Sequence, residues 1–486
     1  MMETCGPLTH ASAIRLVDGR LPAYISAAAL NGYYNRTSNN RSPDLSRMGM
    51  TPIHGAAVPY LRNAIAFHQL HIPIKQKSLT PGILLTGKIT MQSKTLYLKA
   101  TALLGGCTVF AATALAVTST ATRPQLSSAD ARTYTIAKYL ASFGTIGSLT
   151  TDNWDPTGGV GAVSGFRANY AVAADGTAQY KTVQAAIDAA VNAGGVARRY
   201  ISVKAGTYNE LVCVPESAPP ITLYGLDANA GNTQIVYNNA NPTPAAGART
   251  NPCMGTSSNA TVGTLRSATA MVRASDFHAR NLTFKNSYVE GTYADNNQSA
   301  VALAVRGDKA ILENVSVIGN QDTLFVGATS TTTVIRAYFK NSFIQGDTDF
   351  IFGAGTAVFH GCTIQYTAAR LGAKAASYIF APSTAPGNPY GFLAINSTFN
   401  ATGNPPNNSL HLGRAWDQSV SGTSAYINGS SPNGQVVIRD SSLGALIRLA
   451  DPWGPSTAGR PYCSANCAYS ANRFFEYNNT GAGSGN

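Results

Sequence analysis

One short pattern recurs through the second half of the chain and limits its fold more than any other feature. Each copy is an apolar run, a small polar corner residue and a second apolar run, with Ser or Thr after most corners. The corners are Asn281, Asn314, Asn341, Gly361, Asn396 and Asp440. These residue types tolerate the left-handed backbone conformation that a sharp corner needs. Each copy is therefore predicted to be two short strands joined at a corner.

The spacing of the corners predicts how these strands are arranged. Successive corners are 20 to 44 residues apart, which indicates a short repeating unit with insertions of variable length. Strand–corner–strand units at this period are typical of a parallel β-helix, in which each coil stacks on the next. A β-sandwich would explain the short strands but not the fixed place of the corner. We therefore expect an all-β protein built as a parallel β-helix.

The two ends of the solenoid give their own signals. Apolar residues recur at helical spacing ahead of a Gly-Gly pair, at Val183, Ala186, Ile187 and Ala190. This pattern predicts a short helix that caps the N-terminal end of the solenoid, where exposed strand edges need cover. The tail, residues 450–486, is expected to pack along the side of the solenoid, with 481–486 frayed.

The formal net charge of +12 is compatible with a nucleic-acid binder, a membrane-surface protein or an enzyme of acidic polymers. Residues 1–116 hold 11 of the Lys and Arg side chains and 3 of the Asp and Glu side chains, so the rest of the chain has a net charge of only +4. That part shows no basic run and no interleaving of aromatic and basic residues. We therefore expect no nucleic-acid partner. An apolar fraction of 44% also excludes a disordered chain.

A second start signal lies inside the chain. Met91 is followed by Lys94 and Lys99, then by an uncharged apolar stretch that ends in Ala114-Leu-Ala116. This order is typical of a cleaved secretory signal peptide, and a membrane anchor is the alternative. We expect translation to start at Met91, which makes 1–90 an unstructured upstream extension, 91–116 the signal peptide, 117–165 a linker or N-terminal region, and 166–480 the catalytic domain. The mature protein is then expected to be secreted and to have no membrane contact.

Export permits disulfides. The cysteines of the region that would be exported are Cys213, Cys253, Cys362, Cys463 and Cys467. Cys463 and Cys467 are close enough in sequence to pair, and the odd total leaves at least one thiol free or buried. Because the chain has no Cys-x-x-Cys pair and its histidines are scattered, we expect no metal and no other cofactor.

Three segments of the repeat region carry polar groups suited to chemistry: Gln321-Asp322-Thr323-Leu324, Asp349-Phe-Ile-Phe-Gly353 and Leu412-Gly-Arg414-Ala-Trp416. Asp322 and Asp349 each lie eight residues after a corner. Since equivalent positions of successive coils stack in a β-helix, this shared offset predicts two neighbouring carboxylates on one face. Turn capping by the two Asp and a surface charge at Arg414 are the alternative interpretations.

These motifs resemble those of the pectin methylesterase family, which belongs to the carbohydrate esterases. Further matches are 175–177, 206–210 and 300–303, and the resemblance extends from Tyr170 to Glu476. It implies a right-handed parallel β-helix and a secreted enzyme of microbial type. The implied substrate is methyl-esterified homogalacturonan, that is, pectin, and the implied reaction releases methanol. The resemblance also implies that the enzyme is a monomer and needs no cofactor.

The resemblance also implies a role for each motif residue. Asp349 is the expected nucleophile, and Asp322 the acid that protonates methoxide and then the base that activates water. Gln321 is expected to donate its amide to the tetrahedral oxyanion, Arg414 to hold Asp349, and Trp416 to offer an apolar wall to the sugar. An adjacent guanidinium favours the ionised form that a carboxylate nucleophile needs, while a second carboxyl beside it is favoured in its protonated form.

Three departures from the family pattern stand out. The family's Gln-Ala-Val-Ala-Leu is replaced by Gln298-Ser299-Ala-Val-Ala-Leu, so either Gln298 or Ser299 occupies the place of a second oxyanion donor, or that donor is missing. We take Gln298 as the candidate substrate-binding residue. Ala415 stands where Pro is usual, and 327–333 is an apparent insertion at the edge of the groove.

Two other classes of function remain open on the sequence. A β-helix protein that binds carbohydrate with a weakened site would fit the departure at Ser299. Another β-helix pectin enzyme, a hydrolase or a lyase, would instead need a water-spaced acid–base pair or a carboxylate cluster for Ca²⁺. Methanol release, as opposed to polymer binding alone or chain cleavage, separates these possibilities.

Overall fold

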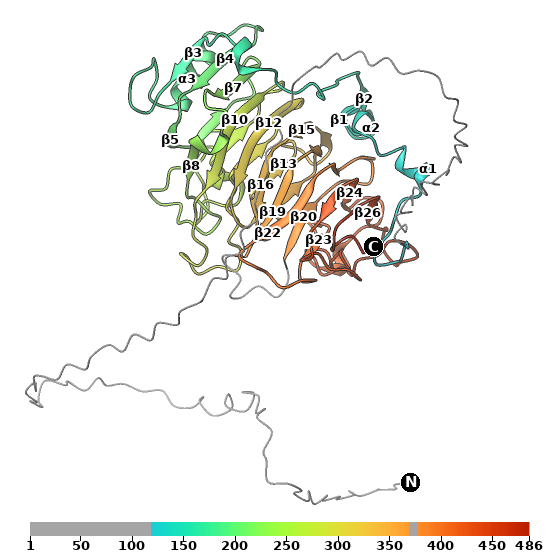
Figure 1. Cartoon of the computed structure of the whole chain (residues 1–486). Helices are drawn as coiled ribbons and strands as arrows, with labels where there is room; N and C mark the ends of the chain where they lie inside the picture. The colour runs from blue at the N-terminus through green and yellow to red at the C-terminus, as the bar shows by residue number, and fades with distance from the viewer. Residues whose placement is uncertain (1–117, 369–376, 486) are drawn as a thin grey trace, which may run out of the picture. The chain divides into compact units, whose positions relative to one another are not determined.

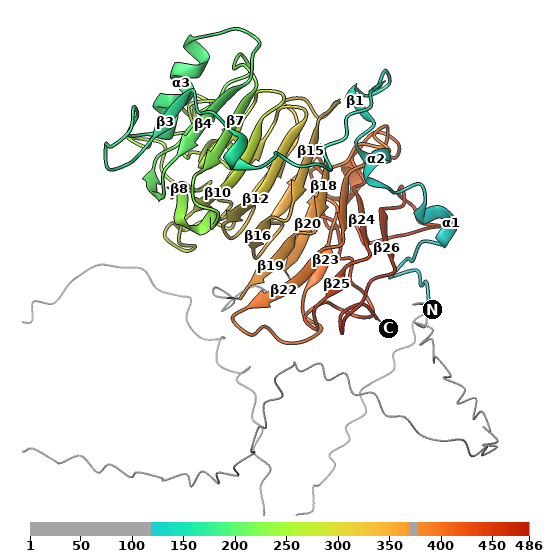
Figure 2. The same cartoon turned by 45° about the horizontal axis from the view of Figure 1, so that its top comes forward.

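The computed structural model describes residues 118–368 and 377–485 (Figure 1). The predicted upstream extension and signal peptide, 1–90 and 91–116, lie outside the described residues. Strands dominate, and among the described residues no helix has the length and apolar character needed to cross a membrane. Figure 2 shows the strands side by side along the solenoid, from β3 and α3 at one end to β24 and β26 at the other.

A seven-stranded parallel sheet forms one face of the solenoid and positions the candidate site. Its order is β23-β20-β17-β13-β11-β9-β6, and we call it the cleft sheet. The strands are β6 (Val212–Val214), β9 (Ala270–Val272), β11 (Leu303–Val305), β13 (Leu324–Val326), β17 (Ile351–Gly353), β20 (Tyr378–Pro382) and β23 (His411–Gly413).

The remaining faces of the solenoid belong to a second, 16-stranded sheet whose strands also pair in parallel. Its first strands are β3 (Tyr170–Val172), β4 (Arg199–Val203), β5 (Gly206–Asn209), β7 (Ile221–Gly225), β8 (Thr233–Tyr237), β10 (His278–Asn286) and β12 (Ala310–Ile318). The later ones are β15 (Arg336–Lys340), β16 (Phe343–Gly346), β18 (Thr356–His360), β19 (Thr363–Thr367), β21 (Phe392–Ile395), β22 (Thr398–Thr402), β24 (Gln435–Arg439), β25 (Ser442–Leu443) and β26 (Arg473–Tyr477).

The predicted corners are confirmed. All six have left-handed backbone, with φ from 48° at Asn341 to 64° at Gly361. The corner side chains also link successive coils, because Asn314 Nδ2 donates to Asn281 Oδ1 at 2.8 Å. The prediction of a parallel β-helix is therefore correct. The corner residues that indicate the repeat in the sequence also link neighbouring coils in the structure.

The predicted capping helix is also confirmed. Helix α3 (Val183–Asn192) begins after Thr182, whose side chain accepts a hydrogen bond from the backbone N–H of Ala185. The apolar residues that predict the helix are fully buried in the main core. The helix contacts β3, β4 and β6, the first strands of the solenoid, and so covers its N-terminal end.

Residues 118–165, expected as a linker or N-terminal region, form a packed arm with few regular elements. These are α1 (Ser128–Ala131), α2 (Ile136–Tyr139), β1 (Ser142–Thr145), β2 (Thr150–Thr151) and the 3₁₀ turn η1 (Val163–Gly165). The arm lies against outward-facing residues of the second sheet such as Tyr338 and Val358, and β1 pairs with β14 (Thr333–Val334). Figure 1 shows α1 and α2 beside the C-terminal coils.

The C-terminal tail differs from the expectation. Strand β26 pairs with β24 and adds a further coil, and Asn478 has the same left-handed corner, with φ 50°. Residues 481–485 are not frayed, because Gly483 N–H donates to the carbonyl of Leu443 at 2.9 Å and Ser484 is fully buried. The segment Phe474-Phe-Glu-Tyr-Asn478-Asn-Thr480 has the same strand–corner–Thr pattern, which was the available signal for this coil.

Candidate active site

Asp322 and Asp349 lie next to each other at the start of neighbouring strands of the cleft sheet. Leu324 of β13 pairs with Ile351 of β17, and Gln321 bridges to Thr348, so the two Asp share one register. Both have left-handed backbone, with φ 61° at Asp322 and 48° at Asp349. Such backbone in a non-glycine residue costs roughly 1–3 kcal/mol and is concentrated at functional sites. The two carboxylates line one cleft of about 250 Å³.

Arg414, which follows β23, forms a bidentate ion pair with the Asp349 carboxylate. Nε donates to Oδ1 at 2.9 Å and Nη2 to Oδ2 at 2.5 Å. Burial lowers the pKa of Arg414, but the Asp349 carboxylate outweighs burial and raises it above its usual value. The guanidinium also lies 4.2 Å from the ring centre of Tyr378, which stacks on His411. Arg414 is thus fixed as a permanent cation beside one of the two carboxylates.

The neighbouring histidine adds no second cation to this corner of the site. Burial, reinforced by the charge of Arg448, lowers the pKa of His411 to about 4. His411 is therefore neutral near neutral pH and serves as a flat stacking partner for Tyr378. The positive charge next to Asp349 comes from Arg414.

An amide network occupies the opposite side of the cleft. Gln321 Nε2 donates to Asn297 Oδ1 at 3.3 Å and to Ser299 Oγ at 3.4 Å. Asn297 Oδ1 also accepts the backbone N–H of Ser299 at 3.0 Å and the Ser299 hydroxyl. Because that backbone N–H can only donate, Asn297 must present its oxygen, and Gln321 must present its nitrogen to it.

The structure does not bring Gln298 to the cleft. Its Oε1 accepts from the Tyr288 hydroxyl at 2.7 Å and from Gly291 N–H, and its Nε2 donates to the carbonyls of Tyr293 and Asp295. The amide oxygen and nitrogen of Gln298 therefore both bind the loop that precedes it. Ser299 and Asn297, not Gln298, line the cleft. Sequence reasoning missed Asn297, and its place two residues before Ser299 was the available signal.

Aromatic side chains form the apolar wall of the cleft. Trp416 packs against Phe352, with ring centres 5.7 Å apart, and Phe352 packs on Phe325 in the same outward row of the sheet. The loop that carries Trp416 is held from behind by a fully buried ion pair in which Arg460 grips Asp417 with two bonds of 2.9 and 2.7 Å. That pair fixes the loop although Ala415 lacks the rigidity of a proline.

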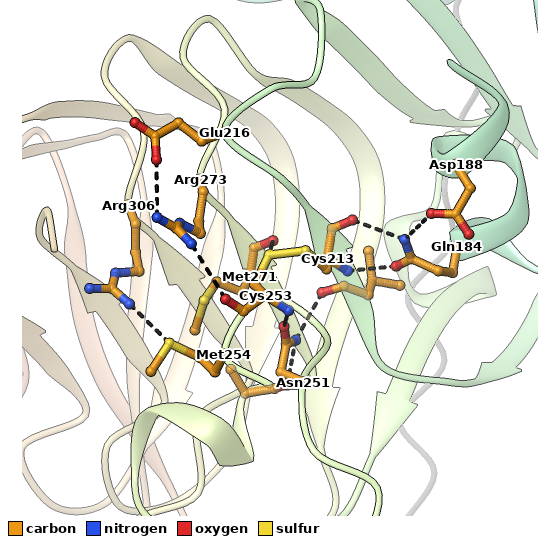
Figure 3. Close-up of a disulfide and its surroundings, with 12 residues drawn as sticks. Gln184, Asp188, Cys213, Glu216, Asn251, Cys253, Met254, Met271, Arg273 and Arg306 are labelled. Atoms are coloured by element: carbon orange, nitrogen blue, oxygen red, sulfur yellow. Dashed lines mark hydrogen bonds and ion pairs between the residues drawn. A yellow bond between two sulfur atoms is a disulfide. The ribbon is translucent and has the colours of Figure 1, made fainter. Parts of the chain in front are cut away.

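A disulfide anchors the loop on the other rim. Cys213 in β6 is bonded to Cys253, and Asn251 next to it donates to the carbonyls of Val212 and Ala268 (Figure 3). This loop leads into the 3₁₀ turn η3 (Leu265–Ser267), whose Leu265 lines the cleft. The sequence did not reveal this pairing, because the two cysteines are 40 residues apart.

The other predictions on cysteines are confirmed. Cys463 and Cys467 form the second disulfide, and Cys362 is a buried free thiol. Burial raises the pKa of the Cys362 thiol to about 12. The thiol is therefore uncharged and unreactive at neutral pH, because the thiolate is the nucleophilic form.

The fold and the cleft together define a parallel β-helix protein with a paired-carboxylate site, and comparison with known proteins gives its family. The pectinesterase family model matches residues 169–429. A pectinesterase of Ralstonia nicotianae is 99% identical over 396 residues, which are 82% of this chain and all of that protein. The chain belongs to the pectinesterase family and is a carboxylic ester hydrolase.

Solved structures agree in fold. The rice weevil pectin methyl esterase is 33% identical, with a TM-score of 0.64, and the match covers 75% of this chain and 99% of that one. A pectin methylesterase in complex with a hexasaccharide is 27% identical, with a TM-score of 0.52 over 66% of this chain and 91% of that one.

Proposed function

We propose that this esterase hydrolyses the methyl esters of galacturonate residues in pectin, with Asp349 as the nucleophile and Asp322 as the acid and then the base. The bidentate ion pair between Arg414 and Asp349 is the observation that supports Asp349, and not Asp322, as the nucleophile. A guanidinium at this distance stabilises an ionised carboxylate. Asp349 is thereby kept in the form that attacks a carbonyl carbon.

The first half of the reaction forms a covalent intermediate. Asp349 attacks the ester carbonyl, and the carbonyl oxygen becomes a tetrahedral oxyanion. One N–H of the Gln321 amide donates to this oxyanion in place of its long bond to Ser299, while its bond to Asn297 keeps the amide oriented. When the tetrahedral centre collapses, Asp322 gives its proton to the departing methoxide and methanol leaves. The galacturonyl group is then joined to Asp349 as an anhydride.

The second half restores the enzyme. Asp322, now ionised, takes a proton from a water molecule, which attacks the galacturonyl carbonyl of the anhydride. Collapse releases the polymer's carboxylic acid, which loses its remaining proton to solvent, and returns Asp349 to its ionised state beside Arg414. Asp322 ends protonated, so the cycle closes without a cofactor. Trp416 and Phe352 give the sugar an apolar wall during both steps.

Methanol release from methylated pectin tests this proposal. Asp349→Asn keeps the shape of the side chain but removes the nucleophile, so release should fall to background while the folded state persists by circular dichroism. Asp451→Asn, which changes an exposed carboxylate paired with Arg448, is the matched control and should keep wild-type turnover. Wild-type turnover in Asp349→Asn would refute the assignment. Polymer binding without methanol, or chain cleavage, would instead support one of the alternative functions.

We also propose that the protein is secreted as a monomer, after translation from Met91 and removal of 91–116. In support, the 396 residues matched by the Ralstonia nicotianae protein equal the length of the span 91–486. Residues 166–480 then form the catalytic domain, and 117–165 its packed arm. N-terminal sequencing of the exported product should begin near residue 117, and peptides from 1–90 would contradict the proposal. Sedimentation of that product measures its oligomeric state.

A further inference from the structure

The side chain of Asn297 has an amide oxygen that is fully engaged and an amide nitrogen that is not. Its Oδ1 accepts from Gln321 Nε2 at 3.3 Å, from the backbone N–H of Ser299 at 3.0 Å and from the Ser299 hydroxyl. Its Nδ2 has no hydrogen-bond acceptor in the part of the chain that the structure describes. Asn297 is an exposed residue that lines the cleft of the two carboxylates. The cleft therefore contains an amide donor that is open to a ligand.

The two residues that follow Asn297 do not offer such a donor. Gln298 Nε2 already donates to the carbonyls of Tyr293 and Asp295. Ser299 is buried, and its hydroxyl gives its single proton to Asn297 Oδ1. Within the segment 297–299, Asn297 is thus the residue whose side chain can donate a proton to a substrate.

The position of Asn297 is fixed before a substrate binds. Its backbone N–H donates to Asp295 Oδ1 at 2.7 Å, and its carbonyl accepts from Asn241 Nδ2 at 3.1 Å. The three bonds to Oδ1 hold the plane of the side-chain amide. A donor that is fixed in advance stabilises developing charge without the cost of reorganisation.

The amide of Asn297 lies close enough to that of Gln321 for both to bind one oxygen atom. Two N–H donors that share an oxygen are at most about 6 Å apart, because each N···O distance is about 2.9 Å. The bond lengths of an amide place its oxygen and nitrogen about 2.2 Å apart. Since Asn297 Oδ1 is 3.3 Å from Gln321 Nε2, the two nitrogens lie within that limit.

We propose that Asn297 is a further catalytic residue, whose Nδ2 donates to the tetrahedral oxyanion together with Gln321. This inference rests on the proposed function, because the oxyanion forms only when an ester carbonyl is attacked. The charge on that oxygen develops in the transition state, so a donor directed at it lowers the barrier. Asn297 then has two roles: its oxygen orients Gln321, and its nitrogen binds the reacting oxygen.

A double-mutant cycle separates these two roles. Methanol release from methylated pectin is measured for wild type, Asn297→Ala, Gln321→Ala and the double variant, all in the full chain. Without the Gln321 amide the oxygen of Asn297 has no donor to orient there, so the second substitution measures the effect of the nitrogen. We expect the double variant to have a kcat about 10- to 100-fold below that of Gln321→Ala, with little change in KM. The factor is smaller than for a donor in a dry site, because Asn297 is exposed to water.

Two more variants serve as checks. Asn297→Asp keeps the oxygen that accepts from Gln321 and Ser299 but has no N–H, so its kcat should fall at least as far as that of Asn297→Ala. Asn296→Ala truncates an adjacent exposed side chain that does not line the cleft, and it should keep wild-type kcat. Circular dichroism verifies that each variant is folded.

Three results would overturn the role of Asn297 as a donor. These are equal kcat values in Gln321→Ala and the double variant, a wild-type kcat in Asn297→Asp, or a rise in KM without a fall in kcat. If wild type released no methanol from methylated pectin, the proposed function itself would fail, which is a distinct result.

Discussion

Replacing Arg336 with Met should weaken the attachment of the N-terminal arm to the solenoid and leave the cleft unchanged. Arg336 is fully buried at the start of β15 and donates to Asp308 and Asp152 with two bonds each, of 2.6 to 3.1 Å. Its Nη1 also donates to the carbonyl of Leu140 at 2.7 Å. This guanidinium thus joins the arm to the second sheet, beside the pairing of β1 with β14 and the packing on Tyr338 and Val358.

The size of the effect follows from what the substitution leaves behind. Methionine fills much of the volume and keeps contact with Phe143 and Trp154, which flank the guanidinium at 4.3 and 5.1 Å. Asp308 loses its cation, whereas Asp152 keeps its pair with Lys309 at 2.9 Å. Because removing one partner of a buried pair costs about 3–5 kcal/mol, we expect a loss near the lower end, about 3 kcal/mol. Arg448→Met is the control, because its pair with Asp451 is only partly shielded from solvent and is worth about 1 kcal/mol.

Urea unfolding at several pH values measures both the cost and its origin. The hydrogen bonds from Arg336 hold the pKa of Asp152 well below its usual value. A depressed carboxyl pKa adds stability that is present above the unfolded value of about 4 and is lost as pH falls through the folded value. The difference between wild type and Arg336→Met should therefore shrink below about pH 4. Methanol release in native buffer should be unchanged.

Either of two results would refute this reasoning. A loss below about 1 kcal/mol at pH 7 would mean that the ion pairs are balanced by their desolvation. A loss that does not change with pH would mean that packing, and not the charge of Asp152, accounts for the effect.

Two further predictions concern the cleft and the corners. Gln321→Ala should lower kcat about 100- to 1000-fold with little change in KM, because the lost donor acts on the oxyanion; a rise in KM alone would assign Gln321 to ground-state binding. Asn314→Ala should destabilise the solenoid by about 2–3 kcal/mol in urea, since alanine disfavours φ 50° and loses the bond to Asn281. Asn314→Gly loses only the side-chain bonds to Asn281 and to the carbonyl of Ala228 and should cost about 1 kcal/mol less; equal losses in the two variants would show that backbone conformation is not the cause.

Much of the fold could be predicted because the determining interactions are local. A corner residue such as Asn341 needs a left-handed backbone whatever surrounds it, so its recurrence shows where each coil turns. The capping helix could be predicted for the same reason, because its apolar residues recur at helical spacing within one short segment. The C-terminal coil was missed, although Asn478 carries the corner signal, because the glycine-rich residues after it show no second apolar run.

The same distinction between local and long-range interactions applies to the candidate site. The sequence by itself determined that Asp322 and Asp349 sit at equal offsets from their corners, and a stacked coil turns equal offsets into neighbours. Only the tertiary structure decided which amides face the cleft. The Gln298 side chain bonds to the loop that precedes it, and Asn297 is the residue that orients Gln321. It also paired Cys213 with Cys253. Periodicity reports contacts between equivalent positions, whereas loops that cross between coils make contacts that no repeat encodes.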